Sequence, residues 1–294
     1  MNKTMASLFV LIGTASYGLL APMVKLAYAA GFSNAEVNGS QMLLGTGGLW
    51  LISIPYLKQL RSISWKNIGL LLGSGTFSGM TAIFYYYSLR ELPASLAIVL
   101  LFQFAWMGIL VEWIHKKRAP NRFQLIAISL ILFGTFLAVG LHASIGNKIP
   151  WLPLLTGLAS AITYTLFLNF SGTVATHIPP LLRSTLLMSG SMLLVLIVFP
   201  PRFLINGALG EGLWFWGGLI GLFSAIIPAI FITTGAPHIG TGMVSIIGSI
   251  ELPVSVVLSY FVLAEPISTW QWLGILLILL GILISDRTFF IQRK

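Results

Sequence analysis

Apolar runs of about 20 residues follow one another along the chain, separated by short clusters of charged, proline and polar residues. A run of this length is what an α-helix needs to cross the hydrocarbon core of a bilayer. In lipid, an unpaired backbone N–H or C=O group is costly, and a helix pairs these groups within itself. No run shows the alternation of apolar and polar residues that is typical of a barrel strand, so helices are favoured. We therefore predict an all-α integral membrane protein with ten transmembrane helices. The predicted spans are 5–29, 36–57, 66–88, 93–113, 122–141, 151–171, 180–200, 212–233, 240–263 and 268–286.

Charge is too scarce for a soluble fold. Charged residues make up 8% of the chain and hydrophobic residues 57%, whereas about a quarter of a soluble domain is charged. The net charge of +9 does not indicate nucleic acid, because most Lys and Arg lie in short loops and no nucleic-acid motif is present. The first run resembles a signal peptide after Lys3, but it is long enough to span.

The loops differ in positive charge from one side to the other. With the N-terminus inside, about eleven Lys and Arg fall on the cytoplasmic side and about four on the other. The cytoplasmic group is Lys3, Lys58, Arg61, Lys66, Lys116, Lys117, Arg118, Arg122, Arg287, Arg293 and Lys294; the other is Lys25, Arg90, Lys148 and Arg202. This asymmetry predicts a protein of the cytoplasmic membrane with both termini in the cytoplasm.

The sequence lacks the residues that several kinds of chemistry require. There is no cysteine, so disulfides and thiolate sites are excluded. The four histidines, His115, His142, His177 and His238, share no metal-ligand spacing, and no Walker motif is present. The seven acidic residues are scattered. We therefore expect no cofactor, no metal and no enzymatic activity.

The sequence repeats itself when it is shifted by 147 residues. Residues 82–84 then fall on 229–231, and residues 130–132 fall on 277–279, without a gap. Polar and small residues also coincide in this register: Tyr17 with Tyr164, Gln124 with Gln271, and Gly134 with Gly281. We predict two repeats, residues 5–141 and 151–286. Because each has five spans, the second enters the membrane with opposite polarity, which is typical of transporters that alternate access.

Glycine spacing indicates close helix packing. Gly69-x-x-x-Gly73 has a counterpart in Gly217-x-x-x-Gly221, within one position of the repeat register. Small residues let membrane helices approach closely, either as static packing or as a surface on which helices slide. Pro228 adds a predicted kink within a span, as does Pro253.

The C-terminal segments resemble a known family. The pattern Ile250–Pro253, then Leu263–Pro266, then the glycine-containing last helix with Trp272–Gly281, is similar to the end of an EamA domain of the drug/metabolite transporter superfamily. Lys25 matches a common basic position of that family. The resemblance covers the chain as two EamA units. It implies a ten-helix transporter whose central cavity is formed by helices 1–4 and 6–9.

Glu251 is the clearest ionisable residue inside a predicted span. A charge at the bilayer centre costs about 2.5–3.5 kcal/mol on insertion scales, so this side chain should face a cavity or a partner. The functional interpretation is proton coupling or contact with a substrate ammonium. The alternative is a helix-packing residue beside Pro253. Lys25 either extends to the outer interface, pairs with Glu36 or binds a substrate carboxylate.

Further candidates for substrate contact are aromatic or polar residues within spans. Tyr17 and Tyr164 are related by the repeat, and their phenols need buried partners or cavity water. Tyr86 belongs to a run of three tyrosines, one of which should face inward. The remaining candidates are Gln103, Trp106, Thr233 and Ser249. Together they predict an aromatic and polar cavity with few fixed charges.

The leading functional hypothesis is a secondary transporter that exports a small amphipathic metabolite, such as an amino-acid-like compound, by alternating access. A passive channel, a non-transporting sensor and a membrane enzyme remain alternatives. The expected partners are the small-molecule substrate and the lipid bilayer, with proton coupling and a homodimer left open.

Overall fold

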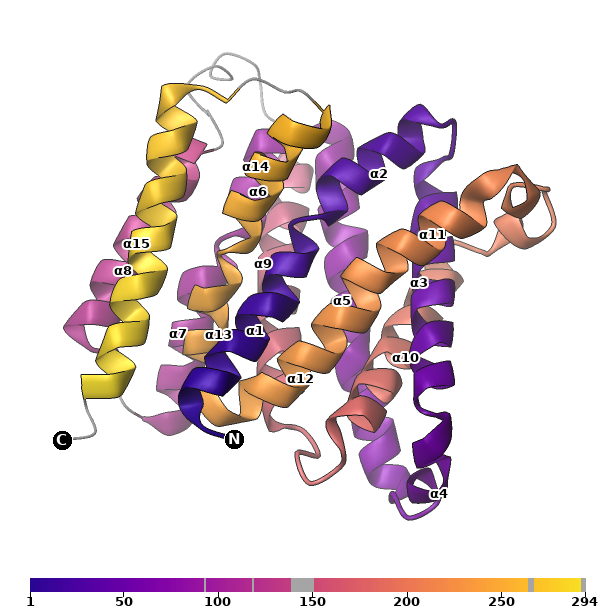
Figure 1. Ribbon diagram of the computed structural model, residues 1–294, viewed down its shortest axis with the longest axis horizontal. Coiled ribbons are helices and arrows are strands. Elements are labelled where there is room, and N and C mark those ends of the chain that lie inside the picture. Colours follow the sequence, from indigo (N-terminus) through magenta and orange to yellow (C-terminus); the bar gives the residue numbers. More distant parts are fainter. Residues whose placement is uncertain (93, 118, 139–150, 264–266, 292–294) are drawn as a thin grey trace.

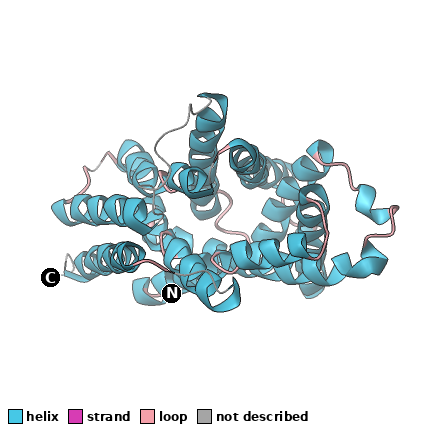
Figure 2. Ribbon diagram, turned by 90° about the horizontal axis from the view of Figure 1, so that it is seen from above, coloured by secondary structure: helices cyan, strands magenta, loops and turns pink. Residues whose placement is uncertain are grey.

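The computed structural model describes residues 1–92, 94–117, 119–138, 151–263 and 267–291. These residues form helices and loops and contain no strand (Figure 2). Seven helices in this part are long and apolar enough to cross a membrane. They are Lys3–Ala29, Trp65–Ser88, Ala97–His115, Trp151–Thr173, Pro180–Val198, Leu209–Ile239 and Thr241–Leu263. Arg122–Ala138 and Thr269–Ile284 are shorter apolar helices.

The elements of the first half are these: α1 Lys3–Tyr17, α2 Leu20–Ala29, α3 Asn34–Ile52, η1 Ile54–Tyr56, α4 Leu57–Leu60, α5 Trp65–Glu91, α6 Ala94–Leu101, α7 Phe104–Lys116 and α8 Arg122–Ala138. Those of the second half are α9 Trp151–Thr173, α10 Pro180–Val198, η3 Arg202–Leu204, η4 Leu209–Leu213, α11 Trp214–Gly221, η5 Leu222–Ile226, α12 Ile227–Ile239, α13 Thr241–Gly248, α14 Glu251–Leu263 and α15 Thr269–Ile291. α1 begins and α15 ends on the same side of the bundle, here called the terminal side; the opposite side is the far side (Figure 1).

The two halves are packed into each other rather than side by side. α8 packs on α15, α1 on α12, α3 on α11, α7 on α13, and α5 on both α9 and α10 (Figure 1). Each of these pairs joins a helix before residue 140 to one after residue 150. The main hydrophobic core lies among them and includes the fully buried side chains of Phe104, Phe167 and Ile232. Neither half could bury these surfaces alone.

Three predicted spans are interrupted. The first is broken after Tyr17 at Gly18 and Leu19, and the fourth at Phe102 and Gln103. The ninth is broken at Ser249 and Ile250. The last two breaks occupy equivalent positions in the 147-residue register. Interrupted helices within a membrane expose backbone polar groups, and they are typical of transporter binding sites.

Two prolines lie next to local departures from regular α-helix. Pro228 follows directly after the π-helical segment η5, inside the apolar helix Leu209–Ile239. Pro253 is the third residue of α14, after the break at Ser249 and Ile250. Prolines and π-helical segments are common causes of helix kinks, so the predicted kinks at these two positions stay predictions. A third proline, Pro237, lies inside α12 and leaves the carbonyl of Thr233 without its usual backbone donor.

The two copies of the predicted glycine motif differ in their contacts. In the second half, a Cβ atom on Gly217 would overlap Ser40, and one on Gly221 would overlap the carbonyl of Gln41, so α11 packs closely on α3 as predicted.

In the first half, the tight contact is made by other glycines. A Cβ atom on Gly75 would overlap the carbonyl of Leu187, and one on Gly190 would overlap the carbonyl of Leu72. These contacts bring α5 and α10 together backbone to backbone. In contrast, a Cβ atom on Gly69 or Gly73 would meet no described heavy atom within 4 Å. The face of α5 that carries Gly75, rather than the face of Gly69 and Gly73, therefore makes the tight contact with α10.

Gly75→Ala is expected to destabilise the protein by about 1–3 kcal/mol, because the added methyl group must separate α5 from α10. Gly73→Ala, two residues away on the same helix, should be neutral or stabilising, since alanine favours a helix by about 1 kcal/mol over glycine. Thermal unfolding in detergent measures both. Equal midpoints for the two variants would contradict the crossing.

Candidate functional site

Glu251 is the first residue of α14 and follows the break at Ser249 and Ile250. Its carbonyl oxygen lies against Gly18, at the break between α1 and α2, where a side chain in place of Gly18 would meet it at 2.8 Å. The Glu251 side chain is only partly exposed. The start of a helix carries a partial positive charge that favours a carboxylate. Two interrupted spans therefore place one acidic group at their meeting point.

Three tyrosines from three helices lie within electrostatic range of this carboxylate. Tyr17 of α1, Tyr85 of α5 and Tyr164 of α9 each interact electrostatically with Glu251. The ring centroids of Tyr17 and Tyr164 are 6.3 Å apart, with planes at 80°. Phe104, which occupies the position equivalent to Glu251 in the first repeat, lies 4.8 Å from Tyr164 with planes at 81°. We call Tyr17, Tyr85, Phe104, Tyr164 and Glu251 the aromatic–acidic cluster.

One hydroxyl of this cluster lacks a hydrogen-bond partner, and its carboxylate lacks a cationic one. Within the described part of the chain, the hydroxyl of Tyr164 is buried without a hydrogen-bond partner. The interactions of Glu251 there are those with the phenols, and no described cation pairs with it. Buried polar groups are normally paired, and an unpaired one indicates a site for water, an ion or a ligand.

Tyr86 lies beside the cluster but has a polar environment of its own. Its ring is 6.1 Å from that of Tyr85, and its hydroxyl interacts with the side chains of Asn38 and Gln41 on α3. Gln41 donates to Asn38 at 3.0 Å. The Gln41 side-chain oxygen is buried and has no partner among the described residues. α3 thus extends the polar surface away from Glu251.

Gln103 and Trp106 pair with each other across the break between α6 and α7. The indole of Trp106 donates to the Gln103 side-chain oxygen at 2.9 Å, and the Gln103 amide donates to the carbonyl of Val99 at 3.0 Å. Both side chains are partly exposed. These bonds satisfy backbone and side-chain groups at the break. A role of either residue in substrate binding stays a prediction.

The hydroxyl groups of Ser249 and Thr233 are buried and form hydrogen bonds within the protein. Ser249 donates to the carbonyl of Ser245 at 3.4 Å within the ninth span. Thr233 donates to the carbonyl of Ala229 at 2.6 Å and shares a hydrogen bond with Ser184 at 2.7 Å. Both side chains are almost fully buried. Their contacts stabilise the interior, and a direct contact with substrate stays a prediction for each.

Arg183 of α10 is a buried cation that the sequence did not single out. It is 1% exposed, and its guanidinium donates to the carbonyl of Thr233 at 3.1 Å and to that of Ser171. Pro237 has removed the backbone donor of Thr233, and Ser171 lies in the last turn of α9, where carbonyls lack helical partners. One guanidinium therefore satisfies two unpaired carbonyls on two neighbouring helices.

Polar contacts close the terminal side between α7, α9 and α13. The amide of Gly242, at the start of α13, donates to the Glu112 carboxylate of α7 at 2.9 Å. Thr241 donates to the side chain of Asn169 on α9 at 2.8 Å. A Cβ atom on Gly108 would overlap Ser245, so α7 and α13 touch closely. α6 and α14, which continue these two helices toward the far side, share no comparable packing among their described residues.

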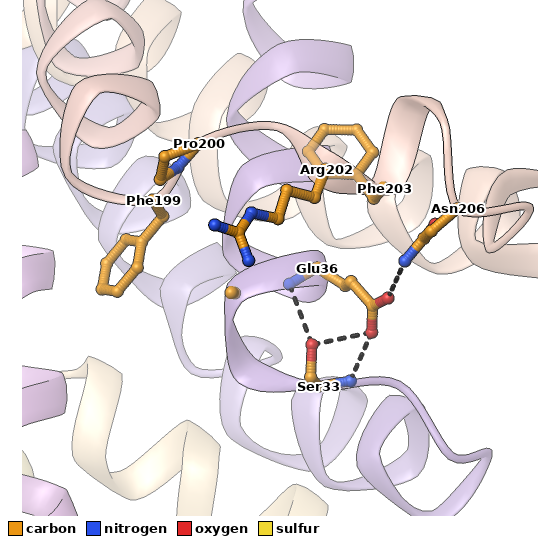
Figure 3. Close-up of a pocket in the computed structure, with 8 residues that line it drawn as sticks. Ser33, Glu36, Phe199, Pro200, Arg202, Phe203 and Asn206 are labelled. Carbon is orange, nitrogen blue, oxygen red and sulfur yellow. Dashed lines mark hydrogen bonds between the residues drawn. The ribbon is translucent and has the colours of Figure 1, made fainter.

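A separate pocket of about 280 Å³ lies at the start of α3 (Figure 3). The Glu36 carboxylate there accepts from the amide of Ser33 at 2.8 Å and from the Asn206 side chain at 2.7 Å. Ser33 and Glu36 form a capping box that satisfies the first turn of α3. The pocket is also lined by Ala35, Phe199, Pro200, Arg202 and Phe203. These bonds fix the loop after α10 on α3, which is a structural role.

Some sequence predictions fall on residues outside the described part: Pro93, Arg118, His142, Lys148, Glu265, Pro266, Arg293 and Lys294. Among the described residues, no group of three or more His, Asp or Glu side chains could hold a metal ion. The aromatic–acidic cluster is therefore the candidate functional site.

Known proteins show similarity over most or all of the chain. The model of the EamA-like transporter family matches residues 4–140 and again 151–285. An uncharacterised transporter of Synechocystis is 24% identical over 277 residues, which cover 86% of this chain and 81% of that protein. An uncharacterised transporter of Archaeoglobus fulgidus is 24% identical over 74% of this chain and 76% of its own length.

A solved crystal structure of another protein superposes on the whole of both chains with a TM-score of 0.80 at 14% identity, which supports the fold alone. The family match, the similar transporters and the apolar helices together identify a multi-pass membrane transporter. The chain belongs to the EamA-like transporter family.

Proposed function

We propose that this transporter is a secondary transporter of the cytoplasmic membrane that exports small amphipathic metabolites by alternating access. The observation that carries the proposal is the composition of the aromatic–acidic cluster. Tyr17 and Tyr85 come from the first half of the chain, and Tyr164 and Glu251 from the second. When the two halves move relative to each other, a site formed by both can be exposed to one side of the membrane and then to the other.

The arrangement of the ten proposed spans supports this mechanism. Residues 5–141 and 151–286 would form two inverted five-helix units, and the breaks in the fourth and ninth spans fall at equivalent positions. α7 and α13 are packed together on the terminal side, whereas the described residues of α6 and α14 share no comparable packing on the far side. The site would therefore be closed toward the terminal side and reachable from the far side in this conformation.

Reporter fusions test the orientation. We expect fusions after residues 60, 118 and 290 all to report the cytoplasm, because positive charge gathers in the loops of that side. The terminal side would then face the cytoplasm, and the described conformation would be open to the outside. A signal from outside the cell at any of the three positions would contradict the topology.

Counterflow tests the function itself. Purified protein is placed in liposomes loaded with one unlabelled compound from a panel of amphipathic metabolites, and uptake of the labelled compound is followed. A transporter gives saturable uptake that is stimulated by the internal compound. A channel gives flux that neither saturates nor depends on the internal compound, and that result would overturn the proposal.

A further inference from the structure

We infer that the aromatic–acidic cluster is a binding site for an organic cation, and that it selects a monovalent ammonium headgroup over an amino-acid zwitterion. The inference rests on the proposed function and names the substrate class of the same site. It is carried by one carboxylate without a cationic partner among the described residues, by the three tyrosines that interact with it, and by the contacts of the buried Arg183.

Glu251 lies at an interrupted span and is only partly exposed. None of its interactions within the described part of the chain is with a cation. An ionised carboxylate inside a membrane protein is costly unless it has a partner. A partner that arrives from solution, as a cation or as a proton, would remove that cost.

The faces of aromatic rings carry negative potential and attract organic cations. Tyr17, Tyr85 and Tyr164 come from different helices, and all three interact with the same carboxylate. The nearly perpendicular pairs that Tyr164 forms with Tyr17 and Phe104 present rings in several orientations. Such a surface favours a bulky ammonium over a small hydrated ion, because the rings offer no oxygen ligands except the phenols.

A zwitterion also carries a carboxylate, which needs a cationic partner. The buried guanidinium of the described chain is that of Arg183: its Nη1 and Nη2 atoms donate to the carbonyls of Thr233 and Ser171, and its Nε has no hydrogen-bond partner among the described residues. The electrostatic interactions of Glu251 and the three tyrosines do not include Arg183. Lys25 lies on the exposed surface of α2. A substrate carboxylate close to the ammonium would therefore meet the like charge of Glu251. Like charges brought together away from water repel each other strongly, so the zwitterion is disfavoured.

Matched ligands test the inference. Binding to the purified full-length protein is measured by titration calorimetry with phenethyltrimethylammonium, with its α-carboxylated analogue, and with the neutral compound in which carbon replaces the quaternary nitrogen. The permanent charge prevents leakage and titration of the probe. We expect the cation to bind at least about tenfold more tightly than either analogue, because only it satisfies both the carboxylate and the rings.

Variants assign the binding to the cluster. Glu251→Gln and Tyr17→Leu should each weaken binding of the cation by about tenfold or more, and Tyr17→Phe should weaken it less because it keeps the ring. Tyr260→Leu, an exposed tyrosine of α14, serves as the matched control and should not change binding. Thermal unfolding of each variant separates lost binding from lost folding, and a variant that unfolds is replaced by Tyr85→Leu.

Two results would overturn the inference. One is that the zwitterion binds more tightly than the cation and that replacement of Lys25 weakens binding of the zwitterion. The other is no detectable binding of the cation to protein whose unfolding midpoint is native. Neither result would contradict the proposed function, which is tested separately by counterflow with the broader metabolite panel.

Discussion

Glu251→Gln is expected to lower the initial rate of counterflow by about 100-fold, because the variant keeps the shape of the side chain but removes its charge. The carboxylate lies where two interrupted spans meet and interacts with tyrosines from both halves of the chain. Stability should stay the same or rise, since an unpaired charge inside a span costs about 2.5–3.5 kcal/mol and a neutral amide costs less.

The opposite signs of these two effects distinguish transport from packing. If Glu251 only packed the ninth span, the variant would unfold more easily and transport would fall in proportion to folded protein. Glu211→Gln is the matched control, because Glu211 is exposed before α11. Counterflow rates and unfolding midpoints are measured on the same preparations. Normal counterflow by Glu251→Gln would remove this residue from the site.

Arg183→Leu is expected to destabilise the protein by about 2–6 kcal/mol, at about 1–3 kcal/mol for each of two buried carbonyls left without a donor. One carbonyl belongs to Thr233, whose backbone donor is absent because of Pro237. The other belongs to Ser171 in the last turn of α9. Removal of the guanidinium therefore loosens α10 from both α9 and α12.

Thermal unfolding in detergent measures this effect, with Arg202→Leu as the control. Arg202 is exposed on the loop after α10, so its replacement should change stability by less than about 0.5 kcal/mol. Arg183→Lys should fall between wild type and Arg183→Leu, because an ammonium is a more compact donor than the planar guanidinium fork. If Arg183→Leu unfolds at the same temperature as wild type, the two carbonyls do not depend on Arg183.

The apolar runs and the repeat register were the informative parts of the sequence. The register paired Tyr17 with Tyr164, and the structure places their rings 6.3 Å apart beside Glu251. The breaks in two spans were not predicted, although they lie at equivalent positions. Hydrophobicity is averaged over a whole run of residues, so it does not detect a break in the helix that is confined to two residues.

The glycine motif shows a second limit. Gly217 and Gly221 make the predicted close contact with α3, but Gly69 and Gly73 have the same spacing and the contact of α5 with α10 is made by Gly75. Lipid tails and neighbouring helices are equally apolar, so the spacing of small residues does not reveal which face a neighbour covers. Arg183 was missed for a related reason. Its partners are backbone carbonyls of other helices, and the one sequence signal was Pro237 four residues after Thr233.

The most direct test of alternating access holds the terminal side closed. The chain has no cysteine, so Glu112→Cys with Gly242→Cys introduces the only two thiols, one on α7 of the first half and one on α13 of the second, where the Gly242 amide now donates to the Glu112 carboxylate at 2.9 Å. Mercuric ion bridges them, and dithiothreitol reverses the bridge. We predict that bridged protein loses counterflow, that reduction restores it, and that each single-cysteine variant is insensitive to mercury. Undiminished counterflow by protein whose bridge is verified by mass spectrometry would contradict alternating access.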